Sequence, residues 1–248
     1  MINTEGKEHY QPRGVSEANP RASSAEDDSR HGLRLPVVIS DPNAFGWNIA
    51  STLEAEVFRA RNYSETIEEH QQEYRPYQES SVFLLYPDGP HELPLSSMRV
   101  IYPSKKGFKT INDIQAGRLQ LSREGREILS GVRSDQMLEA GTIGVVPELW
   151  HTFGETEASI PLYGGLVALT RQTRAPYVLA SFDAEYFERF SRIFGSDCRA
   201  LGPAVQYMGT PTLPVLMHAE GVVQYAQKRL RWVGDGIAAV ADFMQPVR

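Results

Sequence analysis

The pattern of polar and apolar positions divides this chain into a polar opening and a longer region of alternating strands and helices. The first 34 residues are rich in Glu, Arg, Ser, Asn and Pro and contain almost no large aliphatic side chains. Such a segment buries too little apolar surface to offset the entropy lost on ordering. We therefore predict a disordered tail over residues 1–35 and a single folded domain over residues 36–248.

Helical and strand spacings alternate through the folded region. Apolar residues recur at helical spacing in residues 47–63, 123–132, 160–172, 184–194, 220–231 and 236–244. Short runs typical of strands cover residues 81–86, 97–102, 136–146, 177–182, 205–207 and 215–218. Ser159 and Pro161 favour a helix start at residue 160, and Gly195 favours a helix end. The order of elements predicts an α/β (α+β) fold, with a mixed, mostly antiparallel central sheet flanked by helices.

Composition and charge exclude several classes of protein. Apolar residues make up 41% of the chain and charged residues 23%, which are ordinary globular values. The net charge of −6 disfavours a general nucleic-acid binder, because such proteins need a basic surface. No stretch is long and apolar enough to be a transmembrane segment, and the N-terminus lacks a secretory signal. The only cysteine, Cys198, excludes an internal disulfide and fits a reducing compartment, so we expect a cytoplasmic protein.

Short segments along the chain occur in the order found in one enzyme superfamily. They are residues 56–61 (EVFRAR), 83–85 with 97–99 (FLL and SMR), 139–146 (EAGTIGVV), 162–169 and 195–207 (GSDCRALGPAVQY). This order resembles the GNAT acyltransferases, and within them the acyl-homoserine-lactone synthases and the long-chain N-acyl amino acid synthases. The resemblance covers roughly residues 47–218 and implies a GNAT-like domain with extra C-terminal helices. It also implies an enzyme that transfers an acyl group from a thioester to a small amine, such as an amino acid.

Glu139 is the candidate general base. Acyl transfer to an amine needs a neutral amine, a polarised carbonyl and a leaving thiol. A carboxylate within an otherwise apolar strand has a raised pKa if it is buried, and the resemblance implies that it takes the amine proton through water. The alternative is an ion pair with a cation such as Arg99, which would also be able to orient the base. Tyr207 is the candidate general acid, with Tyr186 as the alternative.

Two glycines, Gly141 and Gly144, interrupt the strand that contains Glu139. They predict a β-bulge and close backbone approach, although glycines that merely weaken the strand are the alternative. In GNAT folds the thioester arm enters at this bulge, where a backbone N–H bonds the carbonyl; N–H groups near Val145 and Val146 are the candidates here. The resemblance thus implies a donor-binding segment made of Ile143, Gly144, Val145, Val146 and Gly154.

The segment after this strand bears on the identity of the donor. Acetyl-CoA users carry a glycine-rich loop there that holds the pyrophosphate at a helix N-terminus. Residues 147–159 instead contain one glycine, no arginine and three acidic residues. We therefore expect acyl-CoA or an acyl-carrier-protein (ACP) thioester as co-substrate, and the carrier protein fits better because its arm has one phosphate.

Four residues are candidates for acceptor binding, and for the arginines a solvated surface is the alternative: Arg59, Arg61, Arg99 and Thr142. Thr142 stands where the lactone synthases have an arginine, which argues against S-adenosylmethionine as acceptor. A basic group near the C-terminus is either a docking site for an acidic carrier protein or a solvated helix end; it contains Lys228, Arg229, Arg231 and Trp232.

The spacing of the histidines, and the absence of the glycine-rich loop and of one acetyltransferase tyrosine, limit the kinds of functional site that we expect. None of the six histidines has the spacing of a metal site, so we expect no metal. The tyrosine of many acetyltransferases is also absent, since Ser191 stands in its place. A non-catalytic protein that keeps the fold to bind a ligand or a partner is therefore the second hypothesis.

Overall fold

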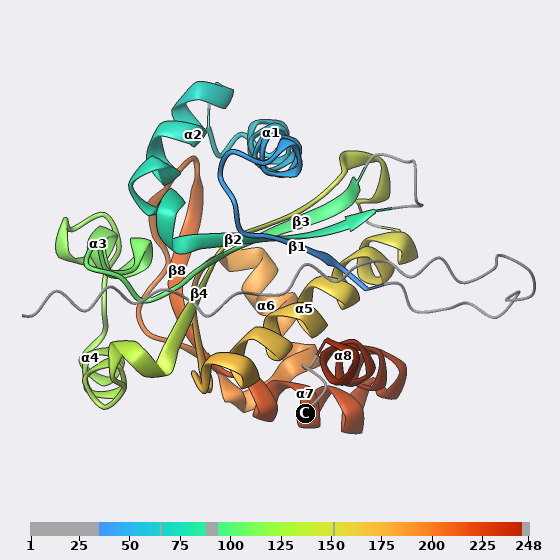
Figure 1. The fold of residues 1–248 in the computed structure, drawn as a ribbon. Coiled ribbons are helices and arrows are strands. Elements are labelled where there is room, and N and C mark those ends of the chain that lie inside the picture. The colour runs from blue at the N-terminus through green and yellow to red at the C-terminus, as the bar shows by residue number, and fades with distance from the viewer. Residues whose placement is uncertain (1–34, 65, 88–93, 151, 245–248) are drawn as a thin grey trace, which may run out of the picture. The chain divides into compact units, whose positions relative to one another are not determined.

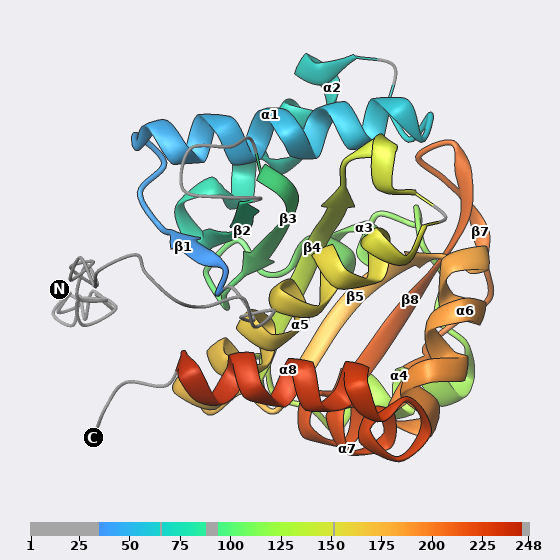
Figure 2. The same ribbon diagram turned by 90° about the vertical axis from the view of Figure 1, so that its right-hand side faces the viewer.

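The computed structural model describes residues 35–64, 66–87, 94–150 and 152–244. These residues belong to one compact unit. The predicted disordered tail lies outside the described residues, apart from Leu35. Figures 1 and 2 show a central sheet with helices packed on both of its faces.

Among the described residues, the central sheet contains eight strands in the order β1-β2-β3-β4-β5-β8-β6, and β7 pairs with β8 off this path. The strands are β1 (Val37–Ile39), β2 (Ser81–Pro87), β3 (Pro94–Ile101), β4 (Met137–Val145), β5 (Tyr177–Asp183), β6 (Cys198–Ala200), β7 (Val205–Tyr207) and β8 (Thr210–His218). Among these strands only β4 and β5 pair in parallel. The predicted mixed, mostly antiparallel sheet is confirmed, and so is the predicted hairpin of β2 and β3.

Helices from the two halves of the chain cover opposite faces of the sheet (Figure 2). One face carries α1 (Phe45–Ala60), α2 (Ile67–Tyr74), α3 (Lys109–Gln115) and α4 (Arg123–Ser130). The other face carries α5 (Phe153–Thr173), α6 (Ala184–Phe194), α7 (Ala219–Arg229) and α8 (Arg231–Phe243). In the described part of the chain, four 3₁₀ turns connect these elements: Arg75–Ser80, Ser134–Gln136, Pro147–Leu149 and Gly195–Asp197.

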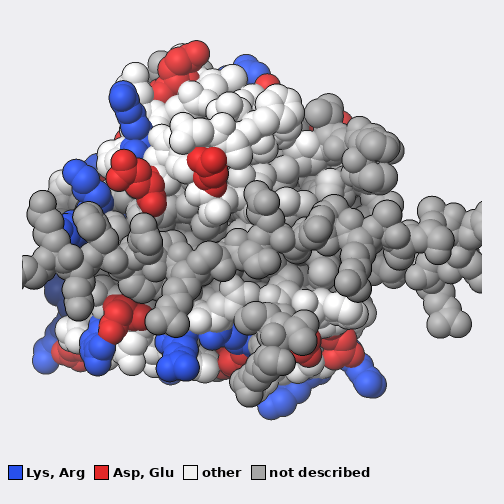
Figure 3. All heavy atoms as spheres, viewed as in Figure 1, with Lys and Arg blue, Asp and Glu red and all other residues white. Residues whose placement is uncertain are grey.

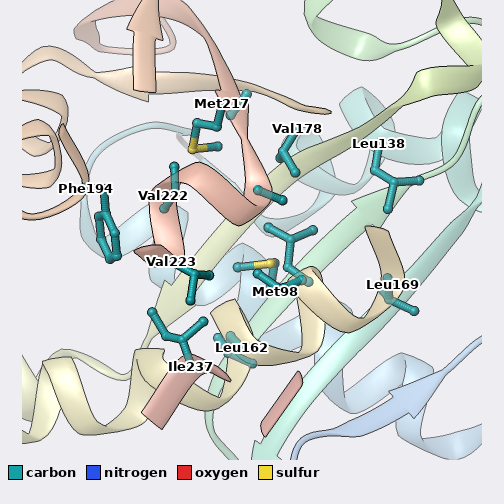
Figure 4. Packing of buried hydrophobic residues seen from close by; sticks show 14 of the residues in the cluster. Met98, Leu138, Leu162, Leu169, Val178, Phe194, Met217, Val222, Val223 and Ile237 are labelled. Atoms are coloured by element: carbon teal, nitrogen blue, oxygen red, sulfur yellow. The ribbon is translucent and has the colours of Figure 1, made fainter. Parts of the chain in front are cut away.

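Alternation along the strands divides the core between these two faces, because successive side chains of a strand point to opposite sides. On the α5–α8 face, apolar side chains from six strands and four helices form the larger core (Figure 4), including Met98, Leu138, Leu162, Val178, Phe194, Met217, Val223 and Ile237. On the α1–α4 face, Trp47 packs edge-on against Phe83 with 4.8 Å between ring centroids.

Helix α5 begins at Phe153, so the predicted start at residue 160 is wrong. Pro161, interpreted as a start signal, lies inside the helix. The preceding turn is held against the sheet: Ala158 is buried, and its carbonyl accepts a hydrogen bond from Ser96 Oγ of β3 at 2.7 Å. This tertiary contact stabilises the helical turns on the N-terminal side of Pro161, and sequence signals alone do not indicate it.

The hydrophobic pattern does not predict α2, α3, β1 or β6. Helix α3 has the sequence KTINDIQ, and its buried residues are Lys109, Thr110 and Asp113 rather than an apolar stripe. Helix α2 is mostly polar and buries only His70 and Tyr74. Both helices bury polar side chains, which are normally found on surfaces, and this explains why the pattern misses them.

Candidate functional site

Strands β4 and β5 diverge halfway along their length. Residues 137–140 of β4 pair with residues 177–180 of β5, and beyond this point β4 pairs only with β3 while β5 pairs only with β8. The divergence opens a wedge in the sheet, bordered by Gly141 on β4 and Ser181 on β5.

A β-bulge lies at the start of this wedge. The register between β3 and β4 shifts so that Arg99 faces Thr142 and Val100 faces Ala140, which leaves Gly141 without a partner. The bulge predicted from the two glycines is thus present at Gly141. Its carbonyl accepts a hydrogen bond from Tyr74 Oη at 2.8 Å, and a Cβ there would lie 3.3 Å from the Tyr74 ring.

Gly144 has a different role. It pairs with Ser97 in the regular ladder, and a Cβ on it would lie 3.2 Å from Val57 of α1. The second glycine therefore allows close approach of the helix to the strand rather than a second bulge.

An apolar cavity of about 190 Å³ extends from the wedge into the core beneath α5–α8. Its inner walls come from strands and helices of the larger core, among them Met98, Val178, Phe182, Phe190, Met217, Val223 and Ile237. At its polar end the Arg61 guanidinium lies 3.9 Å above the Trp150 ring. Such a cavity is suited to an aliphatic chain, whose burial stabilises a complex by about 0.8 kcal/mol per methylene.

A second, smaller cavity of about 60 Å³ lies on the opposite face of the sheet, beside α3, and we call it the polar cavity after the charged and hydroxyl-bearing side chains in its lining. Its lining includes Lys109, Thr110, Glu139, Tyr207 and Thr210. Five residues line both cavities: Phe58, Tyr63, Gly141, Ser181 and Asp183. The two cavities therefore meet in the wedge between β4 and β5.

Glu139 is almost completely buried, with 1% of its surface exposed. Its Oε1 accepts hydrogen bonds from Thr110 N at 2.9 Å and from Thr110 Oγ1 at 2.8 Å. Among the described residues no group donates to Oε2. Burial raises the pKa of Glu139 to about 7, against the opposing effects of the Thr110 hydrogen bonds and the Lys109 charge. A carboxyl group with this pKa is suited to act as a general base near neutral pH.

Tyr207 reaches the polar cavity, as does the unpredicted Lys109. The Tyr207 hydroxyl donates to Asp113 Oδ2 at 2.6 Å and contacts Lys109 Nζ, which lies 2.8 Å from the same carboxylate. Burial, together with the negative charge of Asp113, raises the pKa of Tyr207 well above its usual value. Both features weaken Tyr207 as a proton donor. Its alternative, Tyr186, lines the apolar cavity and bonds the Tyr163 hydroxyl.

Arg99 pairs with Glu54 of α1 and not with Glu139, so the predicted alternative of an Arg99–Glu139 ion pair is wrong. Its guanidinium donates to the two carboxylate oxygens of Glu54 at 2.9 and 2.6 Å. Thr142 also donates to Glu54, and His70 Nε2 lies 3.3 Å from it. Burial would raise the pKa of Glu54, but the charge and hydrogen bonds of Arg99 outweigh it and lower that pKa to about 2.

The remaining residues that the sequence predicts for the site lie in different places relative to the two cavities. Arg59 is exposed on α1, whereas Arg61 and Thr142 line the apolar cavity and Arg99 lines neither cavity. Gly154 lies in the first turn of α5.

The two candidate backbone donors also differ. The N–H of Val146 donates to Leu95 O at 2.9 Å, so it does not point into the wedge. Consecutive residues of a strand direct their backbone groups to opposite sides, and the N–H of Val145 therefore faces the wedge. The carbonyl of Val145 accepts from the Trp150 indole N–H at 2.7 Å.

Sequence reasoning missed Lys109, Thr110 and Ser181. Lys109 and Thr110 begin a helix that the hydrophobic pattern does not reveal, and Ser181 is one small residue in an apolar strand. No motif in the sequence connects these residues with Glu139.

Comparisons with known proteins address the fold. No protein-family model matches the chain, and no curated protein matches its sequence. Among solved structures, FeeM, an N-acyl amino acid synthase from uncultured soil microbes, superposes with a TM-score of 0.57 at 12% identity, covering 77% of this chain and 93% of FeeM. TofI, determined in a ternary complex with an inhibitor and MTA, gives 0.52 at 14% identity, covering 84% and 100%. The AHL synthase LasI gives 0.50 at 11% identity, covering 75% and 89%.

The chain therefore shares the fold of FeeM, TofI and LasI, and this is the GNAT-like fold that its sequence resemblance predicts. Within the described residues there is no cluster of His, Cys, Asp and Glu that would hold a metal ion. The helices of that same part of the chain are too short or too polar to cross a bilayer.

Proposed function

We propose that this chain is an N-acyltransferase, which moves an acyl group from a phosphopantetheine thioester to a small amine such as an amino acid. The observation that carries the proposal is the meeting of an apolar and a polar cavity where β4 and β5 diverge, with Glu139 beside the junction. The fold shared with FeeM and LasI supports it, since those proteins are an N-acyl amino acid synthase and an AHL synthase.

Each cavity suits one substrate. The acyl chain lies in the apolar cavity, and the thioester carbonyl lies in the wedge, where the Val145 N–H stabilises the negative charge that its oxygen gains. The amine approaches from the polar cavity, whose Glu139 and Asp183 attract cationic groups. Glu139, with its pKa of about 7, accepts the proton that the amine loses as the C–N bond forms.

An acyl-ACP is the donor that the surface near the wedge favours over acyl-CoA. The segment between β4 and the buried part of α5 exposes Glu148 and Glu157, which repel the pyrophosphate of coenzyme A. A carrier-protein arm has only one phosphate.

On the face seen in Figure 3, Lys and Arg side chains lie along the lower edge, where α4, α7 and α8 lie, with acidic side chains between them; Arg231 is paired with Asp235. We infer a cytoplasmic location, where such thioesters are formed.

Thiol release measures this function directly. Acyl-ACP and acyl-CoA donors of varied chain length are incubated with the chain and pooled amino acids, and products are identified by mass. Thiol release that depends on the amine, and that Glu139→Gln abolishes, supports the proposal. Glu56→Gln, the same change at an exposed site on α1, is the matched control and is expected to retain activity.

A non-catalytic binding protein is the second candidate, favoured by the lack of a glycine-rich phosphate loop in residues 147–159. The same samples distinguish it. Donor binding that raises the melting temperature, with no thiol release for any donor and amine, supports a binding protein and contradicts the transferase.

A further inference from the structure

Glu139 is the proposed base, yet its carboxylate is poorly placed to touch the amine itself. Its Oε2 is buried, and its Oε1 already accepts both the N–H and the hydroxyl of Thr110. Ser181, in contrast, is half-buried on β5 and lines both the apolar and the polar cavity. Ser181 is therefore one of the polar side chains at the junction of the cavities, with Tyr63 and Asp183, whereas Glu139 lines only the polar cavity.

A chain of hydrogen bonds joins this serine to the base. Ser181 Oγ lies 2.8 Å from Thr110 Oγ1, which lies 2.8 Å from Glu139 Oε1. An ionised carboxylate only accepts hydrogen bonds, so the Thr110 hydroxyl donates to Glu139. The Thr110 oxygen then accepts from the Ser181 hydroxyl, and the lone pairs of Ser181 remain able to accept a proton from a group in the wedge.

We propose that Ser181 and Thr110 form a proton relay, in which Ser181 is a catalytic residue that takes the amine proton and Thr110 passes a proton on to Glu139. This proposal rests on the proposed function and deepens it, since it assigns the residues that connect the acceptor with the base. The residues come from β5, α3 and β4, and the relay forms only where these elements pack together.

The step balances in atoms and charge. A neutral amine attacks the thioester carbon, the C–N bond forms, and the C=O π electrons move to oxygen. The amine proton moves to Ser181 Oγ, the Ser181 proton to Thr110 Oγ1 and the Thr110 proton to Glu139. The oxygen electrons then re-form the C=O bond as the C–S bond breaks, and sulfur leaves with the electron pair of that bond. Return of one proton from Glu139 along the same hydroxyls converts the thiolate into a thiol and restores the starting state.

Substitutions of the two hydroxyls test the relay in the full-length chain. Thr110→Val removes the hydroxyl but keeps the backbone N–H that bonds Glu139, and Ser181→Ala removes the hydroxyl next to the wedge. Both are expected to lower kcat roughly 100-fold, the lower end of what general acid–base catalysis contributes, with KM nearly unchanged. Thr110→Ser retains a hydroxyl and is expected to keep kcat within about fivefold of wild type.

The pH profile separates a relay from a structural role. Loss of the Thr110 hydrogen bond also raises the pKa of Glu139, but that change alone is overcome by raising the pH. A relay predicts that the kcat plateau at high pH stays low in Thr110→Val and in Ser181→Ala. Thr170→Val is the matched control, because it removes a buried hydroxyl that bonds only within α5 and lines neither cavity.

The outcomes distinguish the relay from the function on which it rests. A lowered plateau in both relay variants, with activity in Thr110→Ser and Thr170→Val, supports the relay. Wild-type plateaus in Thr110→Val and Ser181→Ala, while Glu139→Gln is inactive, overturn the relay and leave the acyltransferase standing. A wild-type chain that releases no thiol with any donor and amine overturns the proposed function and the relay with it.

Discussion

The buried carboxyl of Glu139 is predicted to lower the stability of the fold as the pH rises. Its pKa is about 7 in the folded chain, against an ordinary value of 4.5 for a glutamate in water, because burial disfavours the charged form. Between these two values the folded state binds more protons at this site than the unfolded state does. The free energy of unfolding therefore falls through this pH range and is lowest, as far as this group is concerned, above the folded pKa.

The size of the effect follows from the difference in pKa. Each unit corresponds to about 1.4 kcal/mol, so the shift from 4.5 to about 7 corresponds to about 3 kcal/mol of stability lost at alkaline pH. Glu139→Gln removes the titration. Gln carries its own cost, since its amide N–H groups meet no acceptor, but that cost does not depend on pH. The pH-dependent part of the difference between wild type and variant thus isolates the carboxyl.

Urea unfolding of both proteins at pH 4.5, 6, 7 and 8 measures this difference. We expect the free energy of unfolding of Glu139→Gln, relative to that of wild type, to increase by about 3 kcal/mol between pH 4.5 and 8. Most of this change is expected below pH 7.5. Glu56→Gln, an exposed site on α1, is the control and is expected to stay within about 0.5 kcal/mol. A difference between wild type and Glu139→Gln that is the same at every pH would refute the raised pKa and the reasoning from burial.

Four further predictions concern activity and the other buried groups. The acyl-transfer rate constant kcat/KM is expected to rise with pH through about 7, as Glu139 loses its proton, and a profile that is flat from pH 5 to 9 contradicts this role. Arg99→Met removes the arginine that pairs with the buried carboxylate of Glu54 and is expected to cost about 3–5 kcal/mol in urea unfolding; a loss below about 1 kcal/mol would show that the pair is dispensable. Val223→Phe narrows the apolar cavity and is expected to shift the donor preference to shorter chains, with roughly fourfold weaker binding for each methylene that no longer fits, measured as KM against donor length. Tyr207→Phe is expected to reduce kcat less than tenfold, because the hydroxyl is held by Asp113, and a loss of 100-fold or more would make Tyr207 the general acid.

The amino-acid sequence by itself determined most strands and helices of the domain. Alternation and helical spacing place β2, β3, β4, β5, α1 and α6 close to their observed bounds, because these elements bury apolar faces with a regular period. The residues 139–146 mark Glu139 and the bulged glycine of the central strand, since a carboxylate and a glycine are both unusual in a buried strand. These features are local, and a local pattern suffices to predict them.

Tertiary structure alone decided which partners these residues have. Arg99 has several acidic residues available in sequence, and packing of α1 on the sheet pairs it with Glu54, 45 positions away. Thr110 meets Ser181 across 71 positions because α3 packs beside the wedge, although no apolar stripe marks that helix. The partners of a polar side chain depend on distance and burial in the folded chain, and the order of residues in the sequence gives neither. The sequence therefore indicates the base, and only the packing of α3 against β4 and β5 shows the hydroxyls that connect it with the wedge.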